Sequence, residues 1–472
     1  MASVTSKDKK FSPFPGMRPF SPDESEYFFG RENESEEIAG KLLRNRFVSV
    51  TGASGSGKSS LILCGLLPKI RSLSVMGKGN WRILTSRPGS DPFGNLADSF
   101  VENIFSGDPK KEFRNSILKI LKEEPDGIAE VIRKQSAILN GKILLFVDQF
   151  EELFRYGSSG AGMGSGPETE GFLNLLTNAI AHDNPDFYLV IAIRSDLITE
   201  CAHYRSFTNL LNNSNYLVSK MNRDSIREAI VGPVKNAGAD IDSDLVELLI
   251  GEVNDRADQL PVLQHALMRT WLRWKELDEP DRPLDFSDYF SIGTMSDAIS
   301  RHADEIYEKL DDDSKSICER LFKLISGKGS DNKGIRYPSD IKTLRSAIRC
   351  TGDELIKVIE EFRNPSISVL TPHYSVKLDD DSIIDLSHES LIHLWDRLKK
   401  WVDEESLSVQ MYLRLSEASA LYQQGKTGLL KQPDLQLAIN WREQNKPTLW
   451  WAQKYNPAFE RAMVYLRTSE KE

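Results

Sequence analysis

The fold is decided by the stretch Phe47-Val48-Ser49-Val50-Thr51-Gly52-Ala53-Ser54-Gly55-Ser56-Gly57-Lys58-Ser59. It opens with apolar and β-branched residues, which favour a buried strand, and continues in the pattern G-x-x-x-x-G-K-[ST]. The residues that follow, Ser59 to Ile70, have the spacing of a helix. A strand, a glycine-rich loop and a helix in this order predict a phosphate-binding loop at the edge of a parallel sheet.

The loop contains the groups that a magnesium-bound nucleoside triphosphate requires. Glycines let successive backbone N–H groups wrap around phosphates, and the start of a helix favours negative charge there. Lys58 can reach the β- and γ-phosphates, which also makes it a predicted catalytic residue, and the Ser59 hydroxyl can ligate Mg²⁺. The residues predicted to bind nucleotide here are Ser54, Gly55, Ser56, Gly57, Lys58, Ser59 and Ser60.

A second apolar run, Ile143 to Val147, leads into the carboxylates of Asp148, Glu151 and Glu152. Asp148 at a strand end can hold Mg²⁺ directly or through water, and Glu151 or Glu152 can polarise the attacking water as general base. Taken alone, the run favours a buried strand that leads into an acidic helix start. Beside a phosphate-binding loop it favours a metal and catalytic site. The sequence leaves open which glutamate is the base.

Arg194 follows a third apolar run, Phe187 to Ile193. Ligands of open α/β sheets gather at the carboxyl ends of strands, so the guanidinium would lie where the phosphates are expected. We expect Arg194 to sense the γ-phosphate and count it among the catalytic residues. A surface ion pair with Asp196 is the alternative interpretation.

Strand-like runs alternate with helical patterns in the first part of the chain and nearly vanish after Asn222. This alternation predicts an α/β fold in which helices cover both faces of a parallel sheet. The predicted strands are Phe47–Thr51, Trp81–Thr85, Ile143–Val147, Phe187–Ile193 and Tyr216–Val218. The remainder is predicted to be helical, and two helices with a short hairpin, Ser366–Leu370 with Ser382–Leu386, indicate a winged helix.

The predicted organisation has five segments. They are a disordered N-terminus (1–10), a nucleotide-binding domain with a lead-in rich in proline and aromatic residues (11–222), a helical domain (223–312), a winged-helix domain (313–403) and a C-terminal helical segment (404–472). The last segment has helical patterns at Met411–Tyr422 and Trp441–Tyr465. Within the first domain, Gly157 to Thr169 is rich in Gly and Ser and predicts a surface loop.

The composition is typical of a cytoplasmic protein. The 472 residues are 40% hydrophobic and 28% charged, which is ordinary for globular domains. We find no apolar run of about 18 residues that could span a bilayer, and no signal peptide, so we expect no membrane partner. The net charge of −10 argues against electrostatic binding of nucleic acid over the whole surface.

Several motifs together resemble those of the STAND class of signal-transduction NTPases, in particular the novel STAND NTPase family common in bacteria, which is related to NACHT and NB-ARC switches. Apart from the phosphate-binding loop, they are Pro15-Gly16-Met17-Arg18-Pro19-Phe20, Phe28-Phe29-Gly30-Arg31-Glu32, Asp148-Gln149-Phe150-Glu151-Glu152, Ile193-Arg194-Ser195-Asp196, Leu260-Pro261-Val262-Leu263-Gln264-His265-Ala266-Leu267 and Leu386-Ser387-His388-Glu389-Ser390-Leu391-Ile392.

The resemblance implies ATP or ADP with Mg²⁺ as ligands. In that family, Gly30 and Arg31 correspond to the segment that lines the adenine, Pro261 to a helical-domain proline near the base, and His388 to a histidine that contacts the ADP phosphate. On its local pattern alone, His388 is a capping or core histidine. The resemblance further implies a closed ADP-bound monomer that opens and forms a homo-oligomer with ATP, with slow hydrolysis as the timer.

Most relatives carry an effector domain before these motifs or sensor repeats after them, and this chain has neither pattern. We therefore expect either a longer parent protein or separately encoded effector or sensor partners.

The main alternative is a nucleotide-regulated DNA-binding protein that reads a groove with its winged helix. Residues 340–400 contain 9 Lys and Arg against 11 Asp and Glu, whereas a groove reader should be basic, so we do not expect a nucleic-acid partner. A GTPase would need Asn-Lys-x-Asp. Neither Asn332-Lys333-Gly334 nor Asn445-Lys446-Pro447 is followed by Asp.

Overall fold

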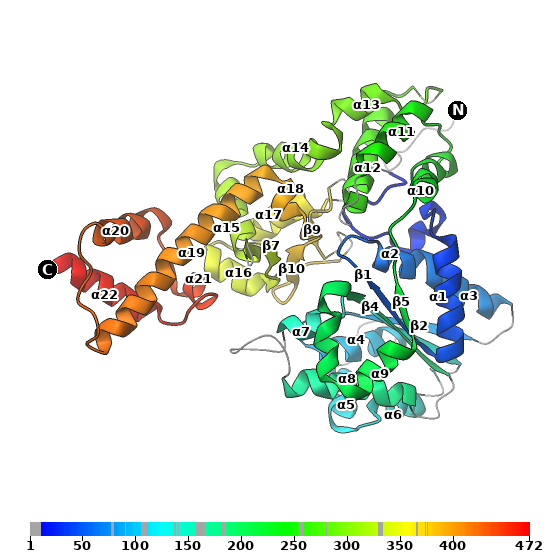
Figure 1. The fold of residues 1–472 in the computed structure, drawn as a ribbon, viewed down its shortest axis with the longest axis horizontal. Helices are drawn as coiled ribbons and strands as arrows, with labels where there is room; N and C mark the ends of the chain where they lie inside the picture. Colours follow the sequence, from blue (N-terminus) through cyan, green and yellow to red (C-terminus); the bar gives the residue numbers. More distant parts are fainter. Residues whose placement is uncertain are drawn as a thin grey trace. The chain divides into compact units, whose positions relative to one another are not determined.

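The computed structural model describes most of the chain, as two compact units (Figure 1). The described residues are 11–76, 80–89, 91–104, 111–135, 138–139, 141–156, 166–181, 186–253, 259–279, 281–328, 334–364, 367–372, 374 and 376–472. The predicted N-terminal segment 1–10 and residues 157–165 of the predicted loop lie outside them. The sheet unit comprises Pro19–Pro261 and Glu279–Asp285, and the helical unit comprises Met1–Arg18, Val262–Asp278 and Phe286–Glu472.

The sheet unit is built on five strands in the order β2-β3-β4-β1-β5. Every neighbouring pair is parallel, so all carboxyl ends reach the same edge of the sheet. The strands are β1 (Phe47–Gly52), β2 (Trp81–Ser86), β3 (Lys142–Val147), β4 (Phe187–Arg194) and β5 (Asn215–Leu217). The predicted parallel sheet is thereby confirmed, and each strand lies within one residue of its predicted bounds.

The strands bury side chains on both faces. Along β3, Ile143, Leu145 and Val147 enter one apolar layer, whereas Leu144 and Phe146 enter the other. This period of two, with apolar residues at every position, is the pattern of a strand covered on both sides.

Helices complete the two layers (Figure 1). One layer is covered by α1 (Glu32–Asn45), by α2 (Lys58–Ser60) with the π-helical turns η3 (Leu61–Leu66), and by α3 (Leu67–Val75). The other is covered by α4 (Pro92–Ile104), α5 (Lys111–Glu123), α6 (Gly127–Lys134), α7 (Glu152–Tyr156), α8 (Pro167–Ala181), η4 (Ser195–His203) and α9 (Arg205–Asn213). Because α8 begins at Pro167, the end of the predicted loop Gly157–Thr169 is helical instead.

The sheet unit continues beyond β5 through α10 (Arg223–Asn236) and α11 (Ser243–Glu252). Residues 19–30 of the lead-in segment (11–30) hold α10 in place. Asn236 on α10 donates to the Glu26 carbonyl in η2 (Pro22–Tyr27) at 3.0 Å, and a Cβ on Gly232 would lie 2.5 Å from the Phe29 ring. Helices that the sequence analysis assigned to the domain 223–312 therefore belong to the sheet unit. The predicted domain limits themselves stay predictions.

The helical unit contains the remaining helices (Figure 1). Helix α12 (Gln259–Glu276) belongs to this unit from Val262 onward. The others are α13 (Phe286–Ser291), α14 (Thr294–Lys309), α15 (Asp312–Ile325), α16 (Ile341–Ile348), α17 (Gly352–Arg363), α18 (Leu391–Leu394), α19 (Asp396–Gln423), α20 (Asp434–Asn445), α21 (Leu449–Gln453) and α22 (Phe459–Lys471). Strand β10 (Ile383–Leu386) pairs antiparallel with β8 (Ser339–Asp340) and β9 (Leu370–Thr371), and β6 (Ser326–Lys328) pairs with β7 (Gly334–Arg336).

The C-terminal helices share their own apolar core, to which Tyr412, Trp441 and Leu466 contribute. Helix α19 runs without a break through the boundary predicted between residues 403 and 404. The predicted helical pattern Trp441–Tyr465 is divided among α20, α21 and α22, because Lys446 adopts a left-handed φ of 44° just before Pro447. None of the described helices is both long enough and apolar enough to cross a membrane.

Two buried histidines face each other in the helical unit. His265 on α12 and His302 on α14 have ring centroids 5.4 Å apart. Burial lowers the pKa of His265 to about 3 and holds the pKa of His302 well below its usual range, and the Arg269 guanidinium acts in the same direction on both. Both rings are therefore neutral at pH 7.

We expect the helical unit to lose stability as the pH falls below 6.5. An unfolded histidine gains a proton near pH 6.5, whereas these two stay neutral when folded. The unfolded state then binds more protons, and the free energy of unfolding falls by up to about 1.4 kcal/mol per pH unit for each histidine. Thermal unfolding between roughly pH 7.5 and pH 5 measures this loss. The double variant His265→Phe/His302→Phe should lose less stability over the same range, and an equal loss would contradict the assignment.

Candidate functional site

The loop between β1 and α2 adopts a tight turn that requires glycine. Gly55 and Gly57 have φ angles of 72° and 87°, in the left-handed region. A Cβ on Gly57 would meet nothing within 4 Å, whereas one on Gly52 would lie 2.7 Å from Ser56 Oγ. The buried Ser56 hydroxyl has no hydrogen-bond partner among the described residues. The loop thus offers both a turned backbone and a spare polar group, which fits a phosphate ligand.

Lys58 is held within this loop. Its Nζ donates to the carbonyl oxygens of Gly52 at 3.0 Å and Ala53 at 2.9 Å. Burial lowers the pKa of Lys58, and the carboxylates of Glu151 and Asp148 oppose that effect. The ammonium therefore lies between the loop and the acidic end of β3, where a triphosphate could replace its carbonyl partners.

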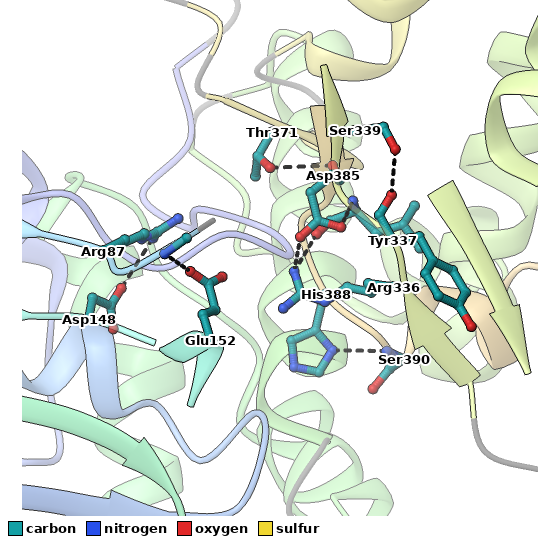
Figure 2. A network of polar contacts seen from close by, with 12 residues as sticks. Arg87, Asp148, Glu152, Arg336, Tyr337, Ser339, Thr371, Asp385, His388 and Ser390 are labelled. Carbon is teal, nitrogen blue, oxygen red and sulfur yellow. Dashed lines mark hydrogen bonds and ion pairs between the residues drawn. The ribbon is translucent and has the colours of Figure 1, made fainter. Parts of the chain in front are cut away.

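Ser59 and Asp148 join the loop to the acidic strand end. The Ser59 hydroxyl donates to Asp148 Oδ1 at 2.7 Å, and Asp148, which directly follows β3, is 2% exposed. The other carboxylate oxygen accepts from Arg87 Nη2 at 3.1 Å (Figure 2). A hydroxyl and a carboxylate are the hard oxygen ligands that Mg²⁺ prefers, so these two side chains fit the metal predicted from the sequence.

Both candidate bases are buried and each accepts a backbone N–H. Glu151 Oε2 accepts from Arg194 N at 3.3 Å, and Glu152 Oε2 accepts from Gly89 N at 3.2 Å (Figure 2). Burial raises the pKa of Glu151, while its own backbone N–H and the nearby Lys58 lower it. Glu151 therefore shares its electrostatic surroundings with the lysine of the loop.

Arg194 is the last residue of β4 and lies directly opposite Gly52 in the register of β1 and β4. Its guanidinium donates to both Asp196 oxygens, from Nε at 3.0 Å and from Nη2 at 2.7 Å. The ion pair weighed as the alternative is therefore present, and it lies beside the first glycine of the loop. The sensing role stays a prediction.

Position 30 requires glycine for two reasons, a left-handed φ angle and close packing against a neighbouring helix. Its φ is 82°, and a Cβ at this position would lie 2.3 Å from the Ser225 carbonyl oxygen at the start of α10. Any larger residue would push α10 away from the start of α1.

Arg31 is buried and links three segments of the sheet unit. Its Nη1 donates to Ser219 O at 2.9 Å, after β5, and to Glu34 Oε1 at 2.7 Å, on α1. Its Nη2 reaches the carbonyl of Ser56 at 3.4 Å, in the loop. The residue predicted to line the adenine thus touches the phosphate-binding loop itself.

A cavity of about 480 Å³ adjoins Arg31. Two of its lining residues, Glu34 and Ser219, are the hydrogen-bond partners of that arginine. Asn33 and Tyr216 also line it. Its polar walls come from α1, β5 and the segment that leads to α10.

Ser60 has a structural partner. Its hydroxyl accepts from the Phe20 backbone N–H at 3.2 Å and so attaches the lead-in segment to the helix after the loop. Phe20 in turn packs edge-on against Phe28, with ring centroids 5.7 Å apart. Ser54 lies on the loop and is half-buried.

Two predicted residues lie further along the chain. Pro261 is on α12 and is the last residue of the main segment of the sheet unit. His388 belongs to the helical unit, between β10 and α18, and its Nδ1 accepts from Ser390 N at 3.2 Å (Figure 2). The contact lies in the turn before α18, whose N-cap is Ser390, and the role of His388 stays a prediction. Asp385, on β10 just before His388, forms an ion pair of 2.5 Å with Arg336.

Sequence reasoning missed Arg87. It follows the edge strand β2, and Ser86 lies opposite Val147 in the register of β2 and β3. The rule used for Arg194, that residues at carboxyl strand ends meet at one edge, also applies to Arg87.

Several solved structures match the chain over most of its length, with low TM-scores. The ORC1 protein of Aeropyrum pernix in complex with DNA has a TM-score of 0.42 and 14% identity, covering 81% of this chain and 94% of its own. The ORC2 protein of Aeropyrum pernix, with ADPNP and ADP, has a TM-score of 0.45 and 10% identity, covering 79% and 94%. A Walker-type ATPase of Pyrococcus abyssi has a TM-score of 0.37 and 14% identity, and the match covers 80% of this chain and 98% of that protein. Likeness at this level carries no argument about function.

The curated proteins include no match to the chain. The family model described as Novel STAND NTPase 1 matches residues 13–428, a range that contains the loop, the acidic strand end and the lead-in segment. The chain therefore belongs to the Novel STAND NTPase 1 family, a family of STAND-class P-loop NTPases.

Proposed function

We propose that this NTPase is a switch that binds ATP with Mg²⁺, hydrolyses it slowly, stays closed with ADP, and opens and oligomerises with ATP to control a partner. The observation that carries the proposal is the 2.7 Å hydrogen bond between Ser59 and Asp148. It joins the phosphate-binding loop to the acidic strand end in a chain of the STAND class.

The loop residues have separate roles in this proposal. Backbone N–H groups between Ser54 and Ser60 bind the phosphates, and Lys58 exchanges its two carbonyl partners for phosphate oxygens. Ser59 and Asp148 would hold Mg²⁺, which neutralises phosphate charge when it is bound. The cavity beside Arg31 is our candidate for the base and ribose.

Glu151 is our first candidate for the general base, with Glu152 as the second. Both are buried, and the charge of Glu151 is coupled to Lys58 and Arg194. A carboxylate close to these cations is placed to accept a proton from water that attacks the γ-phosphate. Glu152 is instead tied to the turn at Gly89.

Arg194 can act as the sensor if it exchanges its present partner for a phosphate. Asp196 is 55% exposed in its side chain, so water can solvate its carboxylate when the guanidinium leaves. A γ-phosphate provides a stronger partner for a guanidinium. Exchange between the two partners would link the state of the nucleotide to η4, which begins directly after Arg194.

The family also supports roles outside the loop. We propose that Pro261 contacts the base, that His388 contacts the phosphate of bound ADP, and that residues 313–403 act as a winged helix. The helices α16 and α17 with the sheet β8-β10-β9 support the last of these.

Substitution of Lys58 tests nucleotide binding. We expect Lys58→Ala to weaken ATP and ADP by about ten- to a hundredfold, because charge-assisted hydrogen bonds to the phosphates are lost. Isothermal titration calorimetry measures the change. Lys69→Ala is the matched control, since Lys69 on α3 is paired with the exposed Glu36, away from the loop. Equal affinities in Lys58→Ala and Lys69→Ala would exclude the loop as the binding site.

Removal of the base tests the switch. Glu151→Gln should bind ATP but hydrolyse it about a hundredfold or more slowly, because a neutral amide cannot accept the proton. With ATP it should then stay oligomeric for longer than the parent. Multi-angle light scattering with ATP and with ADP measures the particle mass, and Glu152→Gln is examined beside it. An unchanged mass in both nucleotides for the parent and both variants would rule out the switch.

A further inference from the structure

The turn after β2 contacts two of the three acidic residues that follow β3, Asp148 and Glu152. Arg87 Nη2 donates to Asp148 Oδ2 at 3.1 Å, and Gly89 N donates to Glu152 Oε2 at 3.2 Å (Figure 2). The turn is therefore part of the candidate site, although it lies outside the loop and the acidic motif.

The backbone of this turn is anchored to α4. The Asn95 amide donates to the carbonyls of Arg87 at 3.1 Å and Pro88 at 3.0 Å. Gly89 has a φ of 54°, and a Cβ there would lie 2.9 Å from the same amide. The base of the arginine side chain is thus fixed, while the side chain itself is 48% exposed and has room to move.

Asp148 already has a partner for each of its oxygens. Oδ1 accepts from the Ser59 hydroxyl, and Oδ2 accepts from Arg87. A divalent cation held by Ser59 and Asp148 would bring a second positive charge close to the guanidinium. Like charges at such separations repel, so the cation and the guanidinium cannot both keep their best contact with this carboxylate.

We propose that Arg87 is a positioning residue that competes with Mg²⁺ for Asp148 and so sets the Mg²⁺ concentration at which nucleotide binds. The inference rests on the proposed function, because it concerns the same metal ligands. Its effect is moderate, since the ion pair has one exposed member.

The test measures binding of a fluorescent ADP analogue in EDTA and over a series of free Mg²⁺ concentrations. Arg87→Gln should move the midpoint of the Mg²⁺ dependence about two- to fivefold lower, as expected for the loss of a partly exposed ion pair, and should leave the affinity in EDTA unchanged. Arg87→Lys keeps the positive charge but loses the planar guanidinium. Its midpoint should lie between those of the parent and Arg87→Gln.

Two controls accompany this series. Arg133→Gln removes an arginine from α6 whose side chain is 76% exposed and paired with Glu130, and it should leave the midpoint unchanged. Asp148→Asn should remove the effect of any substitution at position 87, because the contested carboxylate is then absent. Thermal unfolding of each variant establishes that it is folded.

The outcomes separate the possible roles of Arg87. An unchanged midpoint, or a shift to higher Mg²⁺, overturns the competition, and the second result would mean that Arg87 prepares Asp148 for the metal. A loss of affinity in EDTA also overturns it, because Arg87 would then contact the nucleotide. If the parent does not bind the analogue at all, the proposed function fails. Mn²⁺ binding measured by electron paramagnetic resonance then tests the competition alone, and tighter binding by Arg87→Gln supports it.

Discussion

The parallel register of the sheet is the constraint on which the rest of the site depends. Strands β1 and β3 are not neighbours, since β4 lies between them. Because all the strands run in the same direction, their carboxyl ends still meet, and the Ser59 hydroxyl reaches Asp148 across the width of β4. A shift of either strand by one residue would turn its side chains to the opposite face and separate this pair.

The same edge concentrates charge in a buried place. Asp148 and Glu151 are buried beside Lys58, and Arg194 and Arg87 supply further positive charge. Each of these groups has a partner within the protein that a nucleotide or a metal would have to replace. Such replaceable pairs are what a switch needs, because a ligand can shift an equilibrium only by its difference in affinity for the two states.

Much of the sheet could be predicted because its signals are local. The run Phe187–Ile193 is short, apolar and rich in β-branched and aromatic residues, a combination that favours a strand buried on both faces. The predicted helical pattern Trp441–Tyr465 is interrupted at Lys446, which has a left-handed φ of 44°. Pro447 marks this break in the sequence, because the residue before a proline disfavours the helical conformation, whereas the spacing of apolar residues on which the prediction rested does not show it. Arg87 was missed for a different reason, because its role arises from the pairing of β2 with β3 and not from its neighbours in sequence.

The account is tested most directly by calorimetric measurement of ADP binding with Mg²⁺ and with EDTA, in the parent and in Ser59→Ala. It predicts that Mg²⁺ tightens binding to the parent, and that Ser59→Ala loses most of this effect while it still binds ADP in EDTA. Ser72→Ala, at an exposed serine of α3 whose hydroxyl donates to the Lys69 carbonyl, should keep the effect. The account would be contradicted if the parent bound ADP with the same affinity with and without Mg²⁺, or if Ser59→Ala retained the full effect of Mg²⁺ on ADP affinity.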